Sequence, residues 1–163
     1  MNLPWSTLPV IIEPMKEKDA MEISTWKYEE PYDLYSNDGS NSLLQELLDG
    51  SYYSASIQHS LIGYFCFGKS AQVPAGAEAG FYQEEALDIG LGLRPNLTGK
   101  GFGASFLKKG IDFAVDTRLP QKIRLTVAAF NQRAITVYQR HGFESTSAFM
   151  SNNIEFIIMT RQV

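Results

Sequence analysis

The segment 93–116, LRPNLTGKGFGASFLKKGIDFAVD, limits the fold of this chain more than any other part of the sequence. An apolar run ends at a proline, Gly99, Gly101 and Gly103 alternate with other residues, and an amphipathic segment follows. This order predicts a strand, a glycine-rich turn and a long helix. Such a turn gathers unpaired backbone N–H groups at the positive end of the helix dipole, where anions bind. We therefore predict a phosphate cradle here, against the alternative of a turn that holds no ligand.

Length, charge and cysteine content narrow the class of protein. A chain of 163 residues that are 44% apolar is long enough for one large core and short for two, so we predict a single domain over residues 1–163. The 14 basic and 18 acidic residues give a net charge of -4. Nucleic acid is therefore excluded as a partner, because no basic surplus exists to neutralise phosphates. Cys66, the one cysteine, excludes an internal disulfide and is predicted to be a small buried hydrophobe.

The N-terminal residues lack the basic start and the apolar run of a secretion signal. No window approaches the roughly 20 apolar residues that a membrane span needs. The sequence has no repeats, and its chain-breaking residues are scattered rather than gathered in a linker. We therefore expect a cytoplasmic protein with no membrane partner.

The segment that leads into the glycine-rich turn, ALDIGLGLRP, has the alternation of a strand. Leucine and isoleucine occupy one face, and Asp88, Gly90 and Gly92 occupy the other, which is therefore predicted to be bare. Two glycines inside a strand mark a bulge or a place where a ligand or another backbone comes very close. Close packing of a helix explains them equally well, and the sequence leaves these two interpretations open.

Apolar periodicity and turn residues predict the other elements. Ser42 and Gln45 form a candidate capping box for a helix that ends before Gly50. His59 lies between two β-rich runs that indicate a hairpin, so it is predicted to be a turn residue, although this turn lacks a glycine. The polar segment 68–85 is predicted to be a long loop that is either disordered or lines a site. The predicted strands are 9–13, 52–58, 61–67, 86–95, 122–128, 143–149 and 154–160, and the predicted helices are 16–28, 42–50, 102 to about 118, and 131–142.

Helices interspersed with hairpins favour an α/β protein of the α+β type. We predict a mixed, mostly antiparallel central sheet flanked by helices, because strands joined by short turns pair antiparallel. A doubly wound parallel sheet would require a helix in each connection between strands, which the predicted hairpins exclude.

Spacing separates three phosphate-binding motifs that compete for the glycine-rich turn. A P-loop requires Lys and then Ser or Thr directly after its last glycine, and GKGFGAS lacks this pair. Gly99, Gly101 and Ala104 satisfy the permissive dinucleotide fingerprint, but the next strand, KIRLTVA, offers no acidic residue about 20 positions further on. A nicotinamide-binding module is therefore a distant alternative. The third motif is the coenzyme A loop.

The segment LGLRPNLTGKGFGASFL resembles the acetyl-CoA signature of the GNAT superfamily of N-acetyltransferases, Gln/Arg-x-x-Gly-x-Gly/Ala. Thr98 or Asn96 stands where the basic or amide residue is usual, depending on which glycines are aligned, and we favour Thr98. A second segment, NQRAITVYQRHGF, resembles the Asn-x-x-Ala-x-x-x-Tyr-x-x-x-Gly-Phe pattern of the same family. The resemblance covers residues 86–143, and two independently spaced motifs are more specific than either alone.

The resemblance implies a GNAT-like acyl-CoA N-acyltransferase fold in which the central strands splay apart and pantetheine lies in the gap. Pantetheine would then bond to the strand backbone at Leu91 and Leu93, which would give the strand glycines a reason. Backbone amides of the turn would hold the pyrophosphate, and Asn131 would contact the cofactor from a neighbouring helix. The implied cofactor-binding residues of the turn are Thr98, Gly99, Lys100, Gly101, Phe102, Gly103 and Ala104. Acetyl-CoA would be the co-substrate, and no metal is expected.

Acetyl transfer to an amine needs a neutral nucleophile, a polarised thioester carbonyl and an acid for the departing thiolate. Tyr138 occupies the general-acid position of the family, although its helical spacing from apolar neighbours would also suit a core residue. The general base is left open between Asp88 on the glycine face of the strand, Glu85 at its start, and a water molecule. His141 is predicted to compensate a helix dipole instead.

The resemblance places the acceptor amine against the segment 26–38 and the loop 69–83. Acidic and tyrosine side chains of the first segment would suit a cationic amine or a basic peptide terminus, although solvated acidic residues explain them equally well. These side chains are Tyr28, Glu29, Glu30, Tyr32, Asp33 and Tyr35. The predicted partners are acetyl-CoA and a primary amine of a small molecule or peptide, and the alternative function is a non-catalytic acyl-CoA binding or sensing module. The identity of the acceptor, the use of longer acyl-CoAs and a homodimer are left open.

Overall fold

A computed structural model describes residues 8–163 and divides them into two compact units. Unit 1 contains the described residues up to Phe65 together with Leu91–Lys109, and unit 2 contains Cys66–Gly90 together with Gly110–Val163. The single domain over the whole chain stays a prediction. The predicted lack of a secretion signal falls partly on residues 1–7, which lie outside the described residues.

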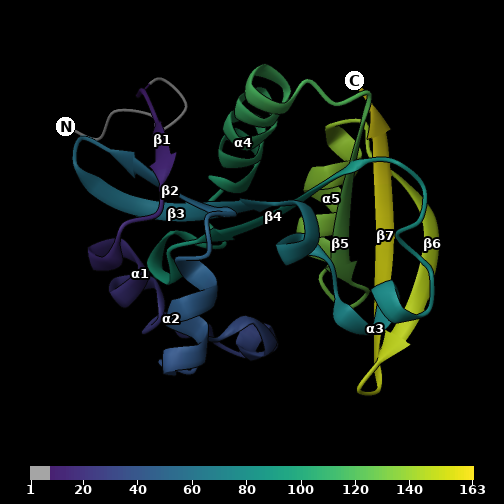
Figure 1. The fold of residues 1–163 in the computed structure, drawn as a ribbon, viewed down its shortest axis with the longest axis horizontal. Helices are drawn as coiled ribbons and strands as arrows, with labels where there is room; N and C mark the ends of the chain where they lie inside the picture. Colours follow the sequence, from purple (N-terminus) through teal and green to yellow (C-terminus); the bar gives the residue numbers. More distant parts are fainter. Residues whose placement is uncertain (1–7) are drawn as a thin grey trace. The chain divides into compact units, whose positions relative to one another are not determined.

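The described strands have the order β1-β2-β3-β4-β5-β7-β6 in one seven-stranded sheet (Figure 1). The pairs β1/β2, β5/β7 and β6/β7 are antiparallel, and β4 and β5 are parallel. The predicted α+β class with a mixed, mostly antiparallel sheet is therefore confirmed. The strands are β1 (Ile11–Pro14), β2 (Tyr52–Ile57), β3 (Ser60–Phe67), β4 (Leu87–Leu93), β5 (Lys122–Ala128), β6 (Glu144–Ser151) and β7 (Ile154–Gln162). The helices are α1 (Glu17–Ile23), α2 (Asn41–Leu47), α3 (Pro74–Glu78), α4 (Gly103–Arg118) and α5 (Gln132–Arg140), with 3₁₀ turns η2 (Tyr32–Tyr35), η3 (Gly68–Ala71) and η4 (Pro95–Leu97).

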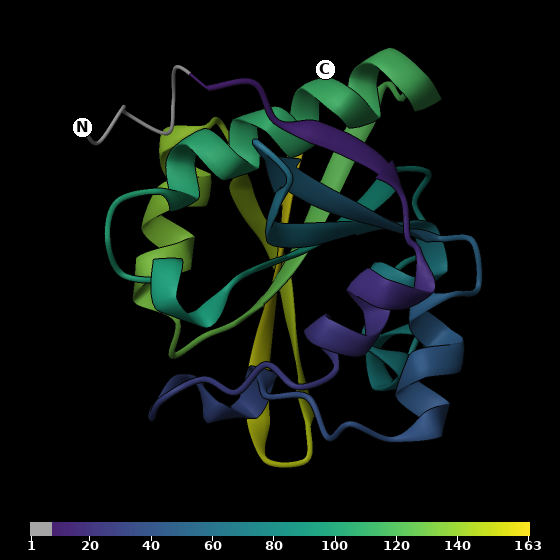
Figure 2. The same cartoon turned by 90° about the vertical axis from the view of Figure 1, so that its left-hand side faces the viewer.

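In unit 1, helices cover both faces of the strands β1–β3. Figure 2 shows α1 and α2 on one side of these strands and the start of α4 on the other. The apolar residues that predicted the first helix, Ala20, Ile23 and Trp26, are all buried. On the α4 side, the rings of Phe65 and Phe106 stack with their centroids 4.4 Å apart. The helical spacing of the sequence therefore identified the buried face of α1.

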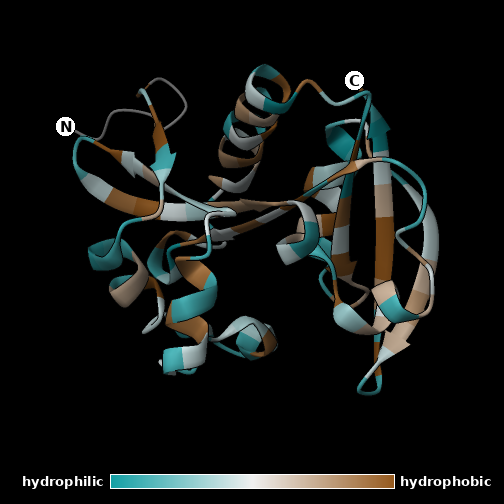
Figure 3. Ribbon diagram, in the orientation of Figure 1, coloured by the Kyte–Doolittle hydropathy of each residue, from teal (hydrophilic) through white to brown (hydrophobic). Residues whose placement is uncertain are grey.

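In unit 2, the strands β5, β7 and β6 lie side by side, with α5 on one side and α3 on the other (Figures 1 and 2). The alternating residues that predicted β5, namely Ile123, Leu125 and Val127, are buried. Figure 3 shows the most hydrophobic stretches of this unit along β5 and β7. On the α3 side, Phe149 of β6 packs directly against the backbone of Gly76, where an added Cβ would lie 2.6 Å from its ring.

The second helix begins at a different residue than predicted. Ser40 is the N-cap of α2, and its Oγ accepts a hydrogen bond from the Leu43 N–H at 3.1 Å. The predicted capping residue, Ser42, lies inside the helix. The chain turns earlier because the Ser40 N–H bonds to the Asp38 carboxylate and Gly39 adopts a positive φ of 69°.

The turn between β2 and β3 is tighter than its sequence suggests. Gln58 and His59 form it with φ values of 49° and 67°, and positive φ at both central residues is the mark of a type I′ turn. The turn between β6 and β7 has the same form with Asn152 and Asn153, at 49° and 64°. His59 is thus a turn residue as predicted, and the turn forms without the glycine that usually favours it.

The segment 68–85, predicted to be a loop, contains regular structure in the form of η3 and α3. Pro74 stands at the start of α3, where its missing N–H costs nothing. The prediction was wrong here because a helix of five residues is too short to show a period in the sequence.

The glycine face of β4 is covered by protein atoms and is not bare as predicted. A Cβ on Gly92 would lie 2.3 Å from the Tyr64 ring, and a Cβ on Gly90 would lie 2.6 Å from the Cys66 sulfur and 3.3 Å from Ala71. Side chains of neighbouring segments therefore require both glycines. Of the two interpretations that the sequence left open, close packing has direct structural support, although the nearest groups, Tyr64 and Cys66, belong to a strand and only Ala71 belongs to a helical turn, η3.

We expect Gly92→Ala to lower the free energy of unfolding by about 1 to 3 kcal/mol, because the added methyl group overlaps the Tyr64 ring. The same substitution in a Tyr64→Ala background should cost much less, since the obstructing ring is gone. Urea denaturation of both single variants and the double variant measures this coupling. An equal cost in both backgrounds would contradict packing as the reason for the glycine.

Candidate active site

The turn between β4 and α4 has the backbone conformation that its glycines allow. Gly99 and Gly101 adopt φ values of 70° and 86°, a region that other residues rarely enter. The Gly101 position is open, because an added Cβ would meet no atom within 4 Å. Conformation, not lack of space, is therefore what requires glycine at this position.

The first turn of α4 presents backbone donors beside these glycines. The Phe102 carbonyl accepts a hydrogen bond from the Phe106 N–H at 3.0 Å, which marks the start of the helix. The first N–H groups of any helix have no acceptor within it, and they lie at the positive end of its dipole. Lys100, Gly101 and Ala104 are exposed, so a ligand can reach this turn from solvent. The arrangement suits a phosphate group.

Thr98 uses its side chain within the turn. Its hydroxyl donates to the Pro95 carbonyl at 2.7 Å and so closes η4. Its backbone N–H donates to the same carbonyl at 3.2 Å. The threonine, which stands in place of the usual basic or amide residue, therefore stabilises the turn that precedes the glycines.

The end of β4, where Leu91 and Leu93 are predicted cofactor contacts, is bound to the segment 26–38 of the same unit. The Tyr28 hydroxyl donates a hydrogen bond of 2.7 Å to the Leu93 carbonyl. Burial raises the pKa of Tyr28 to about 12, so the hydroxyl is a stable donor near neutral pH. The sequence grouped Tyr28 with the acceptor segment, but nothing in its pattern indicated a bond to a residue so far along the chain.

The segment 26–38 forms a closed loop in unit 1. The Asn37 N–H donates to the Trp26 carbonyl at 3.0 Å, and the Tyr28 N–H donates to the Ser36 hydroxyl at 2.8 Å. The Asn37 side-chain amide adds a bond of 2.8 Å to the Ile23 carbonyl of α1. These bonds close the base of the loop. Its acidic residues Glu29, Glu30 and Asp33 are exposed.

Unit 2 holds the predicted general acid. The helix α5 begins where predicted, because the Asn131 side chain accepts the Ala134 N–H at 3.1 Å, and it ends before Gly142, whose φ is 86°. Tyr138 is half-buried, with its ring centroid 6.2 Å from that of Phe143. The intermediate burial of Tyr138 does not separate the acid interpretation from the core interpretation, and the acid role stays a prediction.

Two other titratable residues of unit 2 lie near helix and strand ends. His141, the C-cap of α5, has its Nδ1 2.8 Å from the Val137 carbonyl oxygen, and its role at the helix dipole stays a prediction. Glu85 is exposed directly before β4, and it lines an open cavity of about 710 Å³ together with Arg118 and Lys122.

Asp88 forms a buried ion pair. Its Oδ1 lies 2.6 Å from Arg124 Nε and its Oδ2 lies 2.7 Å from Arg124 Nη2. The Gln72 amide donates to the same Oδ2 at 2.8 Å, and both members of the pair are at most 4% exposed. A general base must lie within hydrogen-bond reach of the substrate, whereas this carboxylate is closed off from solvent and held by three protein donors. We therefore correct the sequence interpretation of Asp88 as a candidate base and treat it as structural.

Arg124 extends this cluster to the segment that precedes β4. Its Nη1 donates to the Glu84 carbonyl at 2.8 Å, and its guanidinium lies 5.0 Å from the centroid of the Tyr82 ring. The Tyr82 hydroxyl in turn lies 2.8 Å from the Thr126 hydroxyl of β5. The hydrogen bond to Asp88 raises the pKa of Arg124, so its charge is permanent. Sequence analysis missed Arg124 because a single arginine inside a strand carries no local signal.

The register between β4 and β5 in unit 2 comprises two pairs, Leu87 with Ile123 and Asp88 with Arg124. The ion pair therefore joins residues that are also direct neighbours in the parallel ladder. The predicted splaying of the two strands beyond this point involves Leu91–Leu93 of the other unit, and it stays a prediction.

Three further observations concern the burial of Cys66, groups of possible metal ligands, and helices that could cross a membrane. Cys66 is buried, as predicted. Between residues 8 and 163, no three His, Cys, Asp or Glu side chains gather closely enough to hold a metal ion. In the same range, every helix is too short or too polar to cross a membrane.

Comparison with known proteins links this architecture to one family. A model described as the acetyltransferase (GNAT) family matches residues 17–143. Comparison with curated proteins gave no match. Among solved structures, the aminoglycoside acetyltransferase AAC(6')-Ib in complex with ribostamycin and coenzyme A has a TM-score of 0.71 and 21% identity, covering 94% of this chain and 93% of that chain.

Two further solved structures share the fold. A GNAT-family acetyltransferase from Bacillus anthracis has a TM-score of 0.70 and 12% identity, covering 94% of each chain. A chimera of the spermidine N-acetyltransferase SpeG from Vibrio cholerae and hSSAT has a TM-score of 0.66 and 19% identity, covering 94% of this chain and 95% of that chain. At these identities the likeness concerns the fold alone.

We expect Asp88→Asn to lower the free energy of unfolding by about 3 to 5 kcal/mol, because it leaves the buried Arg124 charge without its counter-ion. The matched control is Glu84→Gln, which removes a carboxylate that pairs with Lys122 at the surface and should change the stability much less. Denaturant titration of the three proteins measures both effects. If Asp88→Asn were as mild as its control, the pair would not be a main support of unit 2.

Proposed function

We propose that this chain, which belongs to the GNAT acetyltransferase family and is an acetyl-CoA-dependent N-acetyltransferase, transfers acetyl groups to a primary amine of a cationic small molecule or peptide. The observation that carries this proposal is the turn between β4 and α4. Gly99 and Gly101 have positive φ there, and the first donors of α4 follow directly. Such a turn in a chain of this family is the expected site of the CoA pyrophosphate.

Acetyl-CoA would be held by backbone groups of unit 1. The amides of residues 99–104 would bind the pyrophosphate, and the backbone at Leu91 and Leu93 would bind pantetheine. The Leu93 carbonyl accepts one bond from Tyr28 and has a second lone pair for a ligand. In unit 2, the Asn131 side-chain oxygen accepts the Ala134 N–H and caps α5, the helix that carries Tyr138.

The transfer requires two proton movements. The amine nitrogen attacks the thioester carbonyl carbon, the carbon–sulfur bond breaks, the amine gives up a proton to a base, and the sulfur takes a proton from an acid. We assign the acid role to the Tyr138 hydroxyl. With Asp88 held in its ion pair, the base is Glu85 or a water molecule, and Glu85 has the exposure that proton exchange with solvent requires.

The acidic loop of residues 26–38 supports a cationic acceptor. Glu29, Glu30 and Asp33 are exposed on a loop whose base is closed by hydrogen bonds, so their charges stay close together. A cationic amine would be attracted by this local field. Two of the similar structures carry the names of spermidine and of aminoglycosides, which are compounds with several amino groups. A non-catalytic acyl-CoA binding or sensing module is the alternative, and the Tyr138 prediction below separates the two.

The phosphate cradle is tested by two substitutions of equal size at Gly101. Asp and Asn tolerate positive φ about equally well, and the position has room for a side chain. We expect Gly101→Asp to weaken CoA binding at least tenfold more than Gly101→Asn, because only the carboxylate repels the pyrophosphate. Isothermal titration calorimetry with CoA measures both affinities. Equal affinities for the two variants would exclude this turn as the phosphate site.

The general acid is tested by Tyr138→Phe, which keeps the ring and removes its proton donor. We expect kcat to fall by about 10² to 10⁴-fold, with little change in CoA affinity or melting temperature. Release of the CoA thiol in the presence of an accepted amine measures the rate. A variant that turns over at the parental rate would remove Tyr138 from the mechanism.

The acidic loop is tested by replacing Glu29, Glu30 and Asp33 with Gln, Gln and Asn. We expect KM for a cationic amine to rise while KM for acetyl-CoA stays nearly constant, because only uniform binding of the acceptor is lost. A control variant with the same change in net charge neutralises three exposed acidic residues elsewhere, namely Glu17, Asp116 and Glu144. An equal rise in KM for both triple variants would mean that general charge, and not the loop, attracts the amine.

A further inference from the structure

We propose that Arg94 is a positioning residue that fixes the end of β4 and thereby the start of the phosphate cradle. This inference rests on the proposed role of the turn in CoA binding. Arg94 follows β4 directly and is separated from Gly99 by Pro95–Thr98, which comprise η4 and its C-cap. Any movement of Arg94 is therefore passed through one short, closed turn to the cradle.

The backbone of Arg94 joins two elements. Its N–H donates to the Ile62 carbonyl of β3 at 2.8 Å, and its carbonyl accepts the Leu97 N–H at 2.9 Å, which begins η4. The N–H of Arg94 thus bonds to the sheet, and its carbonyl accepts the first hydrogen bond of η4.

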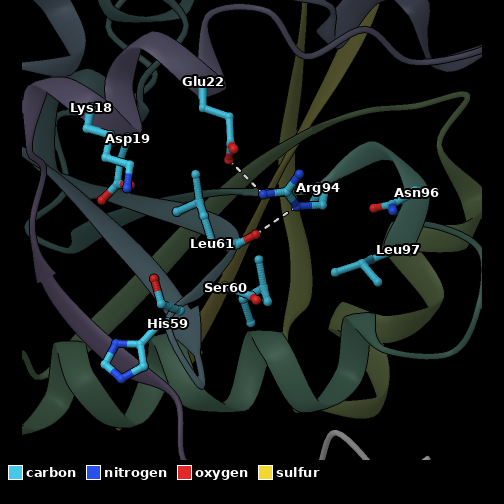
Figure 4. Close-up of a pocket in the computed structure, with 11 residues that line it drawn as sticks. Lys18, Asp19, Glu22, His59, Ser60, Leu61, Arg94, Asn96 and Leu97 are labelled. Atoms are coloured by element: carbon cyan, nitrogen blue, oxygen red, sulfur yellow. Dashed lines mark hydrogen bonds and ion pairs between the residues drawn. The ribbon is translucent and has the colours of Figure 1, made fainter.

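The side chain of Arg94 binds β3 a second time and also binds α1 (Figure 4). Its Nε donates to the Leu61 carbonyl at 2.7 Å, and its Nη2 donates to the Glu22 carboxylate of α1 at 2.6 Å. The guanidinium carbon also lies 5.5 Å from the centroid of the buried Trp26 ring. One planar group therefore holds β3, α1 and the start of the acidic loop to the end of β4.

The geometry requires arginine. Lysine has one charged nitrogen and no planar face, so it could bind Glu22 or the Leu61 carbonyl but could not reproduce the two fixed directions and the contact with Trp26. Two of the five N–H donors of Arg94 bind protein acceptors, and the residue lines an open cavity of about 510 Å³ together with Lys18, Asp19 and His59. The bonds to Glu22 and Leu61 are the observations that indicate a positioning role.

The position of Arg94 predicts which part of the cofactor should suffer when it is replaced. The cradle holds the pyrophosphate, whereas the reacting thioester belongs to the pantetheine end of the molecule. Loss of Arg94 should therefore weaken the use of acetyl-CoA more than the use of acetylpantetheine, which has no pyrophosphate and whose proposed contact at Leu93 is also held by Tyr28. A purely structural loss would affect both donors equally, because both need the folded protein.

The test compares Arg94→Gln, Arg94→Lys and Glu22→Gln with the parent protein, and Arg140→Gln, at the exposed end of α5, is the control for loss of an arginine. We measure Kd for CoA by calorimetry, kcat/KM for each donor, and the melting temperature. We expect Arg94→Gln to raise Kd for CoA about tenfold. Arg94→Lys should recover less than half of the binding free energy that Arg94→Gln loses. Glu22→Gln should raise Kd by a smaller factor than Arg94→Gln. The value of kcat/KM with acetylpantetheine should fall less than the value with acetyl-CoA.

Equal losses for both donors, or no loss for either, would overturn the inference. If Arg94→Gln does not fold, the inference is tested on Arg94→Lys and Glu22→Gln, again by comparing the loss of kcat/KM with acetyl-CoA and with acetylpantetheine. If the parent protein transfers acetyl groups from neither donor but its CoA affinity depends on Arg94 as described, the positioning role stands and the proposed acetyl transfer fails.

Discussion

The buried ion pair between Asp88 and Arg124 is the interaction on which the start of β4 depends. It lies where β4 and β5 pair in parallel, and that register comprises two residue pairs, one of which is the ion pair itself. Because two residue pairs connect β4 and β5 there, the two charged hydrogen bonds of the ion pair add stabilisation that a longer ladder would otherwise provide. The bonds of the pair to Gln72 and to the Glu84 carbonyl also hold the segment before β4. The same contacts remove Asp88 from the candidate bases.

Strand β4 is held by an arginine at each end. Arg124 binds its start within unit 2, and Arg94, with Tyr28 beside it, binds its end within unit 1. Between these points Gly90 and Gly92 let Cys66 and Tyr64 approach the strand backbone closely. Within each unit, the part of β4 that belongs to it is thereby held by side chains, and in unit 1 the glycine-rich turn follows the part that precedes Arg94. A site that must present several backbone donors to one phosphate group needs such a fixed starting point.

Features that depend on neighbouring residues could be predicted from the sequence. The cradle glycines, the Asn131 cap and the buried face of α1 follow from spacing over a few residues, and the structure has each of them in place. The decisive contacts of β4 could not be predicted, because they join residues far apart in the chain. Arg124 gives no local signal that its partner is Asp88. The glycine face of β4 was misjudged for the same reason, since Tyr64 and Cys66 belong to another strand.

The central claim is that the chain transfers acetyl groups from acetyl-CoA to cationic amines. The most direct measurement incubates the parent protein and acetyl-CoA with two amines of equal length, one with a single amino group and one with an amino group at each end. Thiol release gives kcat/KM, and mass spectrometry identifies the acetylated amine. The account predicts acetylation of both, with a higher kcat/KM for the diamine because its second charge binds the acidic loop. Bound CoA without acetylation of these or any other amine would contradict the claim and favour a binding module.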